Sequence, residues 1–171
     1  MPLSRAHGKT PREPWQYGDM ALKEVKKWIN FRHRLVPYLY HTACQTHQSG
    51  IPMIRPLVME YPKDPIAKIQ NLSYMLGDAL LISPGFDRDE YELYLPEGRW
   101  QDIESKEVYE GKTFIHIVNN AFVDGGTSLR VFQKEGTSIP LFAQKEVLHV
   151  PAQLWKQEDL EFMTFQKKDV D

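Results

Sequence analysis

Hydrophobic residues in the first third of the chain recur at helical spacing. Between Gly18 and Gly50, apolar positions come three and four residues apart, which indicates an amphipathic helix. We expect Asp19 to cap the start of this helix and Gly50 to end it. Pro37 lies inside the segment, and we expect it to kink or break the helix because proline lacks a backbone N–H.

A short apolar run, residues 51–61, comes after the helical segment. Its length suits a buried strand, although Pro52 and Pro56 disfavour regular pairing. A second short apolar run, Leu80–Ser83, comes after the turn-like pair Gly77-Asp78. The pattern thus predicts one long helical segment and then short strands.

After residue 85 the helical period disappears, and we place the main boundary there. The remainder alternates in short runs separated by glycines, a pattern typical of an antiparallel sandwich or barrel. We expect a β-domain over residues 86–150 and a tail, or the start of a further β segment, over residues 151–171, where Leu160, Phe162 and Phe165 are spaced for a last strand. The expected strands of the β-domain are Tyr91–Leu95, Thr113–Val118, Ser128–Gln133 and Ile139–Phe142.

Residues 1–85 do not look like a complete fold. Strands of the parallel type need both faces of their sheet covered, and one helical segment with two short strands cannot do this. Tyr38 and Tyr40 are most simply packing residues of the helix. We therefore expect an α+β chain whose first part belongs to something larger, with its apolar helix face exposed when it stands alone.

Composition narrows the class of protein. The chain has 171 residues, 42% of them hydrophobic and 26% charged, with a net charge of −2. No basic stripe suggests a nucleic acid partner, and no run approaches the roughly 18 apolar residues of a membrane span. The single cysteine, Cys44, excludes an intrachain disulfide and a cysteine metal cluster. The opening residues carry no apolar signal core, so we expect a cytoplasmic protein.

Six strings in one order resemble glycoside hydrolase family 31, which contains α-glucosidases and α-xylosidases. The similarity extends from about residue 4 to about residue 145, and its specificity comes from the collinear order rather than from any single string. The strings are SRAHGKTPREPW (4–15), RLVPYLY (34–40), GIPMIRPLVMEYPKDP (50–65), YMLGDALLISP (74–84), YLPEGRWQDIESKEVYEG (94–111) and VFQKEGTSIPLF (131–142).

The resemblance implies that residues 1–85 are the C-terminal end of a (β/α)₈ barrel, a fold whose active site lies at the C-terminal ends of its strands. Residues 1–17 would be the loop after the seventh strand and residues 18–50 the helix behind it. Residues 51–61 would be the eighth strand, and residues 62–85 the eighth helical segment. The β-rich remainder resembles the family's proximal C-terminal domain, expected here as an antiparallel β-sandwich.

The resemblance also bears on catalysis. Retaining glycosidases use two carboxyl groups about 5–5.5 Å apart, and in the family both lie on earlier barrel strands. We therefore assign no catalytic residue, metal or cofactor to this chain. His7 is implied as the substrate-binding residue, because the family's histidine in SR-x-H hydrogen-bonds the sugar and a neutral imidazole can both donate and accept. The alternative, favoured for the chain alone, is a loop histidine without a role.

Other residues with candidate chemistry have simpler interpretations. Arg55 lies in the buried-looking run and needs a partner there, so we expect a structural ion pair rather than a substrate contact. Trp15 is expected to anchor the loop or core rather than to stack on a sugar. Tyr91, Tyr94 and Trp100 could form a carbohydrate-binding platform, but strand alternation directs at least some of them inward. We expect the chain's carboxylates, such as Asp19, Glu24, Asp64, Asp78, Asp87, Asp89 and Glu90, to lie in caps, turns and polar faces.

The sequence therefore favours a partial family 31 protein. The intact parent would hydrolyse terminal α-linked glucosides or xylosides, with an α-linked oligosaccharide as its partner, and this chain would be inactive alone. Two alternatives are a non-catalytic carbohydrate-binding or scaffolding module and one subunit of a split glycosidase. Either the missing barrel portion or self-association would cover the exposed helix.

Overall fold

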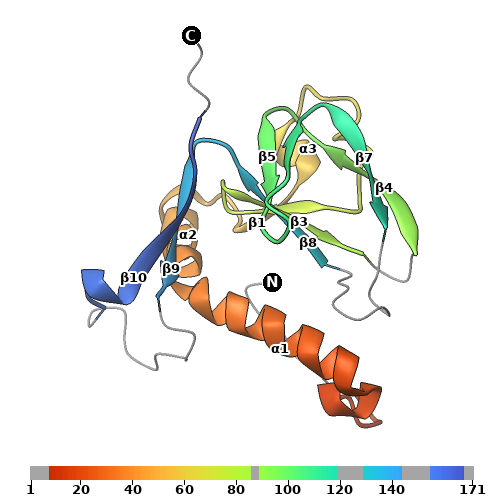
Figure 1. Ribbon diagram of the computed structural model, residues 1–171. Helices are drawn as coiled ribbons and strands as arrows, with labels where there is room; N and C mark the ends of the chain where they lie inside the picture. Colours follow the sequence, from red (N-terminus) through yellow and green to blue (C-terminus); the bar gives the residue numbers. More distant parts are fainter. Residues whose placement is uncertain (1–7, 86–88, 119–128, 144–154, 168–171) are drawn as a thin grey trace.

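The computed structural model describes residues 8–85, 89–118, 129–143 and 155–167. Two α-helices come first, and antiparallel strands make up most of the remainder (Figure 1). This arrangement confirms the α+β class predicted from the sequence. The expected strands of the β-domain are present as β4 (Glu90–Leu95), β7 (Thr113–Val118), β8 (Leu129–Lys134) and β9 (Thr137–Phe142).

The helical segment is split into α1 (Asp19–Arg34) and α2 (Val36–Ser49), after the short 3-10 helix η1 (Pro14–Tyr17). Pro37 stands in the first turn of α2, where a missing N–H removes no helical hydrogen bond. The break predicted near Pro37 is therefore confirmed, and it falls at Leu35.

Of the two predicted helix ends, the structure confirms the one at Gly50 and contradicts the one at Asp19. Gly50 closes α2 in the left-handed conformation, φ 74°, and its N–H donates to the Thr46 carbonyl at 2.8 Å. This confirms the predicted stop, because a residue without Cβ adopts that conformation readily. The capping role expected for Asp19 is wrong. Gly18 is the N-cap without a side-chain bond, and the Asp19 carboxylate lies in the first turn, where it favours the helix dipole.

Residues 51–61 do not form the strand expected for them. Only β1 (Ile54–Pro56) is extended, and α3 (Leu57–Glu60) comes directly after it. Pro56 cannot donate to a ladder, and its fixed φ of −63° suits the residue that precedes a helix. The helical segment expected over residues 62–85 is also wrong, because this stretch carries β2 (Tyr74–Leu76) and β3 (Leu80–Pro84).

The largest sheet has six strands in the order β1-β2-β3-β8-β5-β6, and every pair in it is antiparallel. β3 pairs with β8 along its whole length, from Leu80 opposite Gln133 to Pro84 opposite Leu129. The sheet is thus continuous across residue 85, where the sequence pattern changes. In the largest sheet, β5 spans Arg99–Asp102 and β6 spans Val108–Glu110. Two smaller sheets consist of β4 paired with β7 and of β9 paired with β10 (Leu160–Phe165).

Buried side chains gather in two clusters. One lies within the β-domain around Trp100 and Phe132, which are both fully buried. The other lies between α2 and the strands, where Leu35 and Leu39 meet residues such as Val131. α1 contributes no buried residue to either cluster, and in Figure 1 it extends away from the packed strands. The helix pair is thus attached to the β-domain mainly through α2.

Candidate functional site

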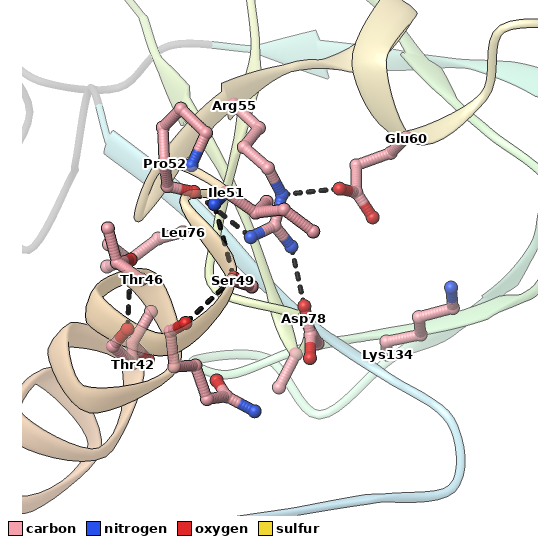
Figure 2. A network of polar contacts seen from close by, with 12 residues as sticks. Thr42, Thr46, Ser49, Ile51, Pro52, Arg55, Glu60, Leu76, Asp78 and Lys134 are labelled. Atoms are coloured by element: carbon pink, nitrogen blue, oxygen red, sulfur yellow. Dashed lines mark hydrogen bonds and ion pairs between the residues drawn. The ribbon is translucent and has the colours of Figure 1, made fainter.

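The turn between β2 and β3 is one of the places where the helix pair contacts the β-domain. Arg55, next to this turn on β1, has only 5% of its side chain exposed. Its Nη2 donates to Asp78 Oδ1 at 2.6 Å, its Nη1 donates to the Pro52 carbonyl at 3.1 Å, and its Nε pairs with Glu60 (Figure 2). The pKa of Arg55 is raised above its ordinary value. Burial alone would lower this pKa, but the attraction of the Asp78 and Glu60 carboxylates outweighs the effect of burial. The predicted structural ion pair is confirmed.

Tyr38, on α2, contacts the same turn through its hydroxyl group. Its hydroxyl donates to the Leu76 carbonyl at 2.7 Å and accepts from the Ala79 N–H at 3.1 Å, so both backbone groups are satisfied without water. Gly77 lies between them with φ 58° and packs directly under the Tyr38 ring. Burial raises the pKa of Tyr38 to about 12. A neutral phenol is therefore held in place throughout the physiological pH range.

Together, Tyr38 and Arg55 fix one turn from two elements. The helix packing expected for Tyr38 is present, but its contact with the turn was not predicted from the sequence. The feature of the sequence that could have predicted this contact is Gly77, since a glycine at a tight turn often marks a close approach by another group. Tyr40 differs, with 50% exposure and an edge-on contact to Trp155.

The structure places the described carboxylates in structural or exposed positions. Asp64 Oδ1 accepts from the N–H groups of Ile66 and Ala67, and its Oδ2 accepts from the Tyr94 hydroxyl at 2.6 Å. Burial opposes ionisation of Asp64, but these hydrogen bonds outweigh it and hold its pKa below the ordinary value. Glu24 accepts from the Trp28 ring N–H at 2.6 Å. Exposed carboxylates include Asp19, Asp89 and Glu90, whereas Asp87 lies outside the described residues.

The candidate aromatic platform is absent from the described surface. Tyr91, Tyr94 and Trp100 are 6%, 2% and 0% exposed, so all three are buried, although alternation places Tyr91 and Tyr94 on opposite faces of β4. The Trp100 ring N–H donates a hydrogen bond to the Pro96 carbonyl at 2.8 Å. Trp15 is 62% exposed in η1, so the anchoring role expected for it is wrong.

The structure does not test the predicted sugar contact of His7. His7 falls outside the described residues, and its role stays a prediction. Among the described residues, no group of three or more His, Cys, Asp and Glu side chains could hold a metal ion. In the same part of the chain, no helix is both long and apolar enough to cross a membrane.

The described residues thus form a helix pair that is fixed to an antiparallel β-domain. The family's TIM-barrel domain, "Glycosyl hydrolases family 31 TIM-barrel domain", matches residues 1–42. The "Glycosyl hydrolase family 31 C-terminal domain" matches residues 50–146. The chain belongs to glycoside hydrolase family 31, and the resemblance stated from the sequence is confirmed. The turn that Tyr38 and Arg55 contact lies within the match to the C-terminal domain, whereas Tyr38 itself lies within the match to the TIM-barrel domain.

Relatives of known name support the same assignment. Alpha-glucosidase 2 of Bacillus thermoamyloliquefaciens is 30% identical over 155 residues, 88% of this chain and 19% of that protein. Alpha-xylosidase of Saccharolobus solfataricus is 31% identical over 147 residues, 84% of this chain and 19% of that protein. The cycloalternan-forming enzyme from Listeria monocytogenes, solved in complex with a pentasaccharide substrate, matches with a TM-score of 0.77 and 30% identity over 91% of this chain and 15% of that one. The chain spans between 11% and 19% of the length of the curated relatives it matches.

Proposed function

We propose that the chain forms the C-terminal part of the catalytic unit of a family 31 α-glycosidase. In this proposal the whole unit cleaves terminal α-linked glucosides or xylosides, with the nucleophile and the acid/base supplied by barrel strands other than those described. The observation that carries the proposal is the consecutive match to the end of the barrel domain and to the C-terminal domain. Relatives named alpha-glucosidase and alpha-xylosidase support the proposed substrate class.

Within this unit, the described residues have a supporting role. The β-domain holds α2 through the Tyr38 contacts and holds residues 51–61 through Arg55. His7 would reach the sugar from the loop before η1 and donate or accept one hydrogen bond. The single cysteine, Cys44, fits a cytoplasmic location, which is part of the same proposal.

Alone, the chain is expected to be inactive. A double displacement requires two carboxyl groups about 5–5.5 Å apart on either side of the scissile bond, and the described carboxylates named above serve as caps, ion pairs or exposed charges. Release of nitrophenol from aryl α-glucosides and aryl α-xylosides tests this directly. The purified chain should match a buffer control, with alpha-glucosidase 2 of B. thermoamyloliquefaciens as the positive control. Hydrolysis proportional to chain concentration would overturn the proposal.

A further inference from the structure

A polar groove lies between α2 and β9, beside the turn from β2 to β3. In Figure 1, α2 packs beside β9, which in turn pairs with β10. The groove has a volume of about 360 Å³, within the range of pockets that bind small ligands. We call it the α2–β9 groove, and its lining includes His41, Gln45, Asp78, Ser138 and Pro140.

Part of the groove wall is rigid because its polar groups are already paired. Tyr38 and Ala79 line the groove, and the Tyr38 hydroxyl accepts from the Ala79 N–H. The Ala79 carbonyl accepts from the Lys134 N–H at 2.8 Å, and the Thr137 hydroxyl donates to the Lys134 carbonyl. A ligand therefore meets a preorganised surface, which keeps the entropy cost of binding low.

Other polar groups of the groove suit a neutral ligand rich in hydroxyls. Gln45 and Ser138 each offer both a donor and an acceptor. Asp78 Oδ1 accepts from Arg55, and the 70% exposure of the Asp78 side chain leaves its second oxygen accessible as an acceptor. Among the described residues that line the groove there is no Lys or Arg, so the groove does not suit a phosphate group.

Exposed aromatic rings border the groove. Phe162 of β10 is directly opposite Pro140 of β9, so the two share one face of the ribbon, and Phe162 is 58% exposed. Tyr40, next to His41 on α2, is 50% exposed, and its ring lies edge-on to Trp155 at 5.5 Å between centroids. Single exposed apolar side chains are common on proteins. Rings beside a groove of amides and hydroxyls, however, offer a ligand a flat apolar face together with hydrogen bonds.

The polar surface continues along α2. A second polar hollow of about 270 Å³ shares Gln45 and Asp78 with the α2–β9 groove, and its lining includes Thr46 and Ser49 (Figure 2). Thr46 donates to the Thr42 carbonyl at 3.0 Å, and Ser49 donates to the Gln45 carbonyl at 2.7 Å. Both hydroxyl oxygens keep acceptor capacity for a ligand. An elongated polar path of this kind suits a chain of sugar units better than a single small molecule.

We propose that the α2–β9 groove binds an α-linked glucan, with a pyranose ring against Phe162 and its hydroxyls on Gln45 and Asp78. A pyranose has an apolar C–H face and a rim of hydroxyls that both donate and accept, which matches an aromatic ring beside amide and carboxylate groups. The saccharide class rests on the groove, and the α-linkage rests on the proposed function. A polymeric substrate held here would stay near the protein between cleavage events, which raises its effective concentration.

Titration of the ¹⁵N-labelled chain with maltohexaose and with isomaltohexaose tests this site. With at least one of them, the amide resonances of Gln45 and Ser138 should shift and saturate. The Kd should be on the order of 1 mM, because an open groove desolvates only part of the sugar. Cellohexaose has the same composition but β-linkages, and it should bind at least about fivefold more weakly than the better α-linked hexasaccharide.

Variants identify the groups that hold the sugar. Phe162→Thr and Gln45→Ala should each weaken binding at least about fivefold, through loss of the ring face and of the amide hydrogen bonds. Threonine suits a strand and alanine suits a helix, so both variants should keep the fold, which thermal unfolding checks. Phe114→Thr is the matched control, because Phe114 is 47% exposed on β7 and lies outside the groove. It should bind normally.

Three results would overturn the proposal. These are no saturable shift with either α-linked hexasaccharide, equal weakening by Phe114→Thr, and equal affinity for cellohexaose. Shifts that follow chain concentration instead of sugar would assign the Phe162 face to a second copy and also overturn it. Hydrolysis is read separately from binding. A chain that releases glucose from maltohexaose would contradict the proposed function and leave the groove site standing, whereas absent binding without turnover would leave the proposed function standing.

Discussion

The Tyr38 hydroxyl lies so close to Gly77 that a Cβ atom at that glycine would overlap it. The contact brings together a residue in the barrel match and a residue in the C-terminal domain match. The hydroxyl bridges the two backbone groups on either side of Gly77 and Asp78, the Leu76 carbonyl and the Ala79 N–H. The Tyr38 side chain thus links α2 directly to the turn between β2 and β3.

Gly77→Ala should destabilise the chain by about 2–4 kcal/mol, because it combines a strained positive φ with a clash against a buried ring. Gly50→Ala is the matched control. Gly50 also has a positive φ, but nothing lies within 4 Å of a Cβ there, so its cost should be only about 1–2 kcal/mol. Urea unfolding curves measure both values. Equal costs at the two positions would show that the Tyr38 contact does not constrain the turn.

Tyr38→Phe should cost about 1–3 kcal/mol, since it leaves the buried Leu76 carbonyl and Ala79 N–H without their partner. Tyr40→Phe, at a half-exposed position of the same helix, should be nearly neutral. Thermal unfolding followed by circular dichroism distinguishes the two. A neutral Tyr38→Phe would mean that water or a shifted backbone replaces the hydroxyl.

Stability should fall in alkaline solution. Burial raises the pKa of Tyr38 from an ordinary 10.0 to about 12 in the folded chain. Above pH 10 the unfolded phenol loses its proton while the folded one keeps it, so this contribution to stability is complete below pH 10 and is lost between about pH 10 and 12. Urea midpoints measured across this window should decline, and less steeply in Tyr38→Phe. Identical slopes would contradict the assignment to Tyr38.

Arg55→Met should destabilise by about 2–4 kcal/mol, because it removes a buried cation that satisfies the Pro52 carbonyl and two carboxylates. Asp78→Asn should cost less than about 1 kcal/mol, since Asp78 is 70% exposed and Glu60 still balances the guanidinium. Chemical denaturation of the two variants provides the comparison. A larger cost for Asp78→Asn would mean that the turn, rather than the buried guanidinium, dominates the network.

The sequence predicted the elements whose pattern is local. Helical spacing over residues 18–50, Pro37 and Gly50 located α1 and α2, and alternation located β4 and β7. Residues 51–61 were misassigned because an apolar run of that length suits a short helix as well as a strand. Here Pro56 ends β1 and precedes α3.

Other features depend on contacts far apart in the chain. The pairing of β3 with β8 joins residues about fifty positions apart, and no local periodicity encodes it. The charge of Arg55 predicted an ion pair, because a buried guanidinium needs a carboxylate, but it did not identify Asp78 or Glu60 as the partners. The pattern around Tyr38 likewise indicated helix packing and not the carbonyl that its hydroxyl contacts.

The proposed function predicts that no carboxylate of this chain attacks a glycoside. Retaining glycosidases form a covalent glycosyl-enzyme intermediate, which a slowly hydrolysed fluorinated α-glucosyl fluoride traps. Intact mass spectrometry of the purified chain after incubation with this reagent should show the unmodified mass, while alpha-glucosidase 2 of B. thermoamyloliquefaciens gains one sugar. A single glycosyl adduct on an Asp or Glu of this chain would contradict the account.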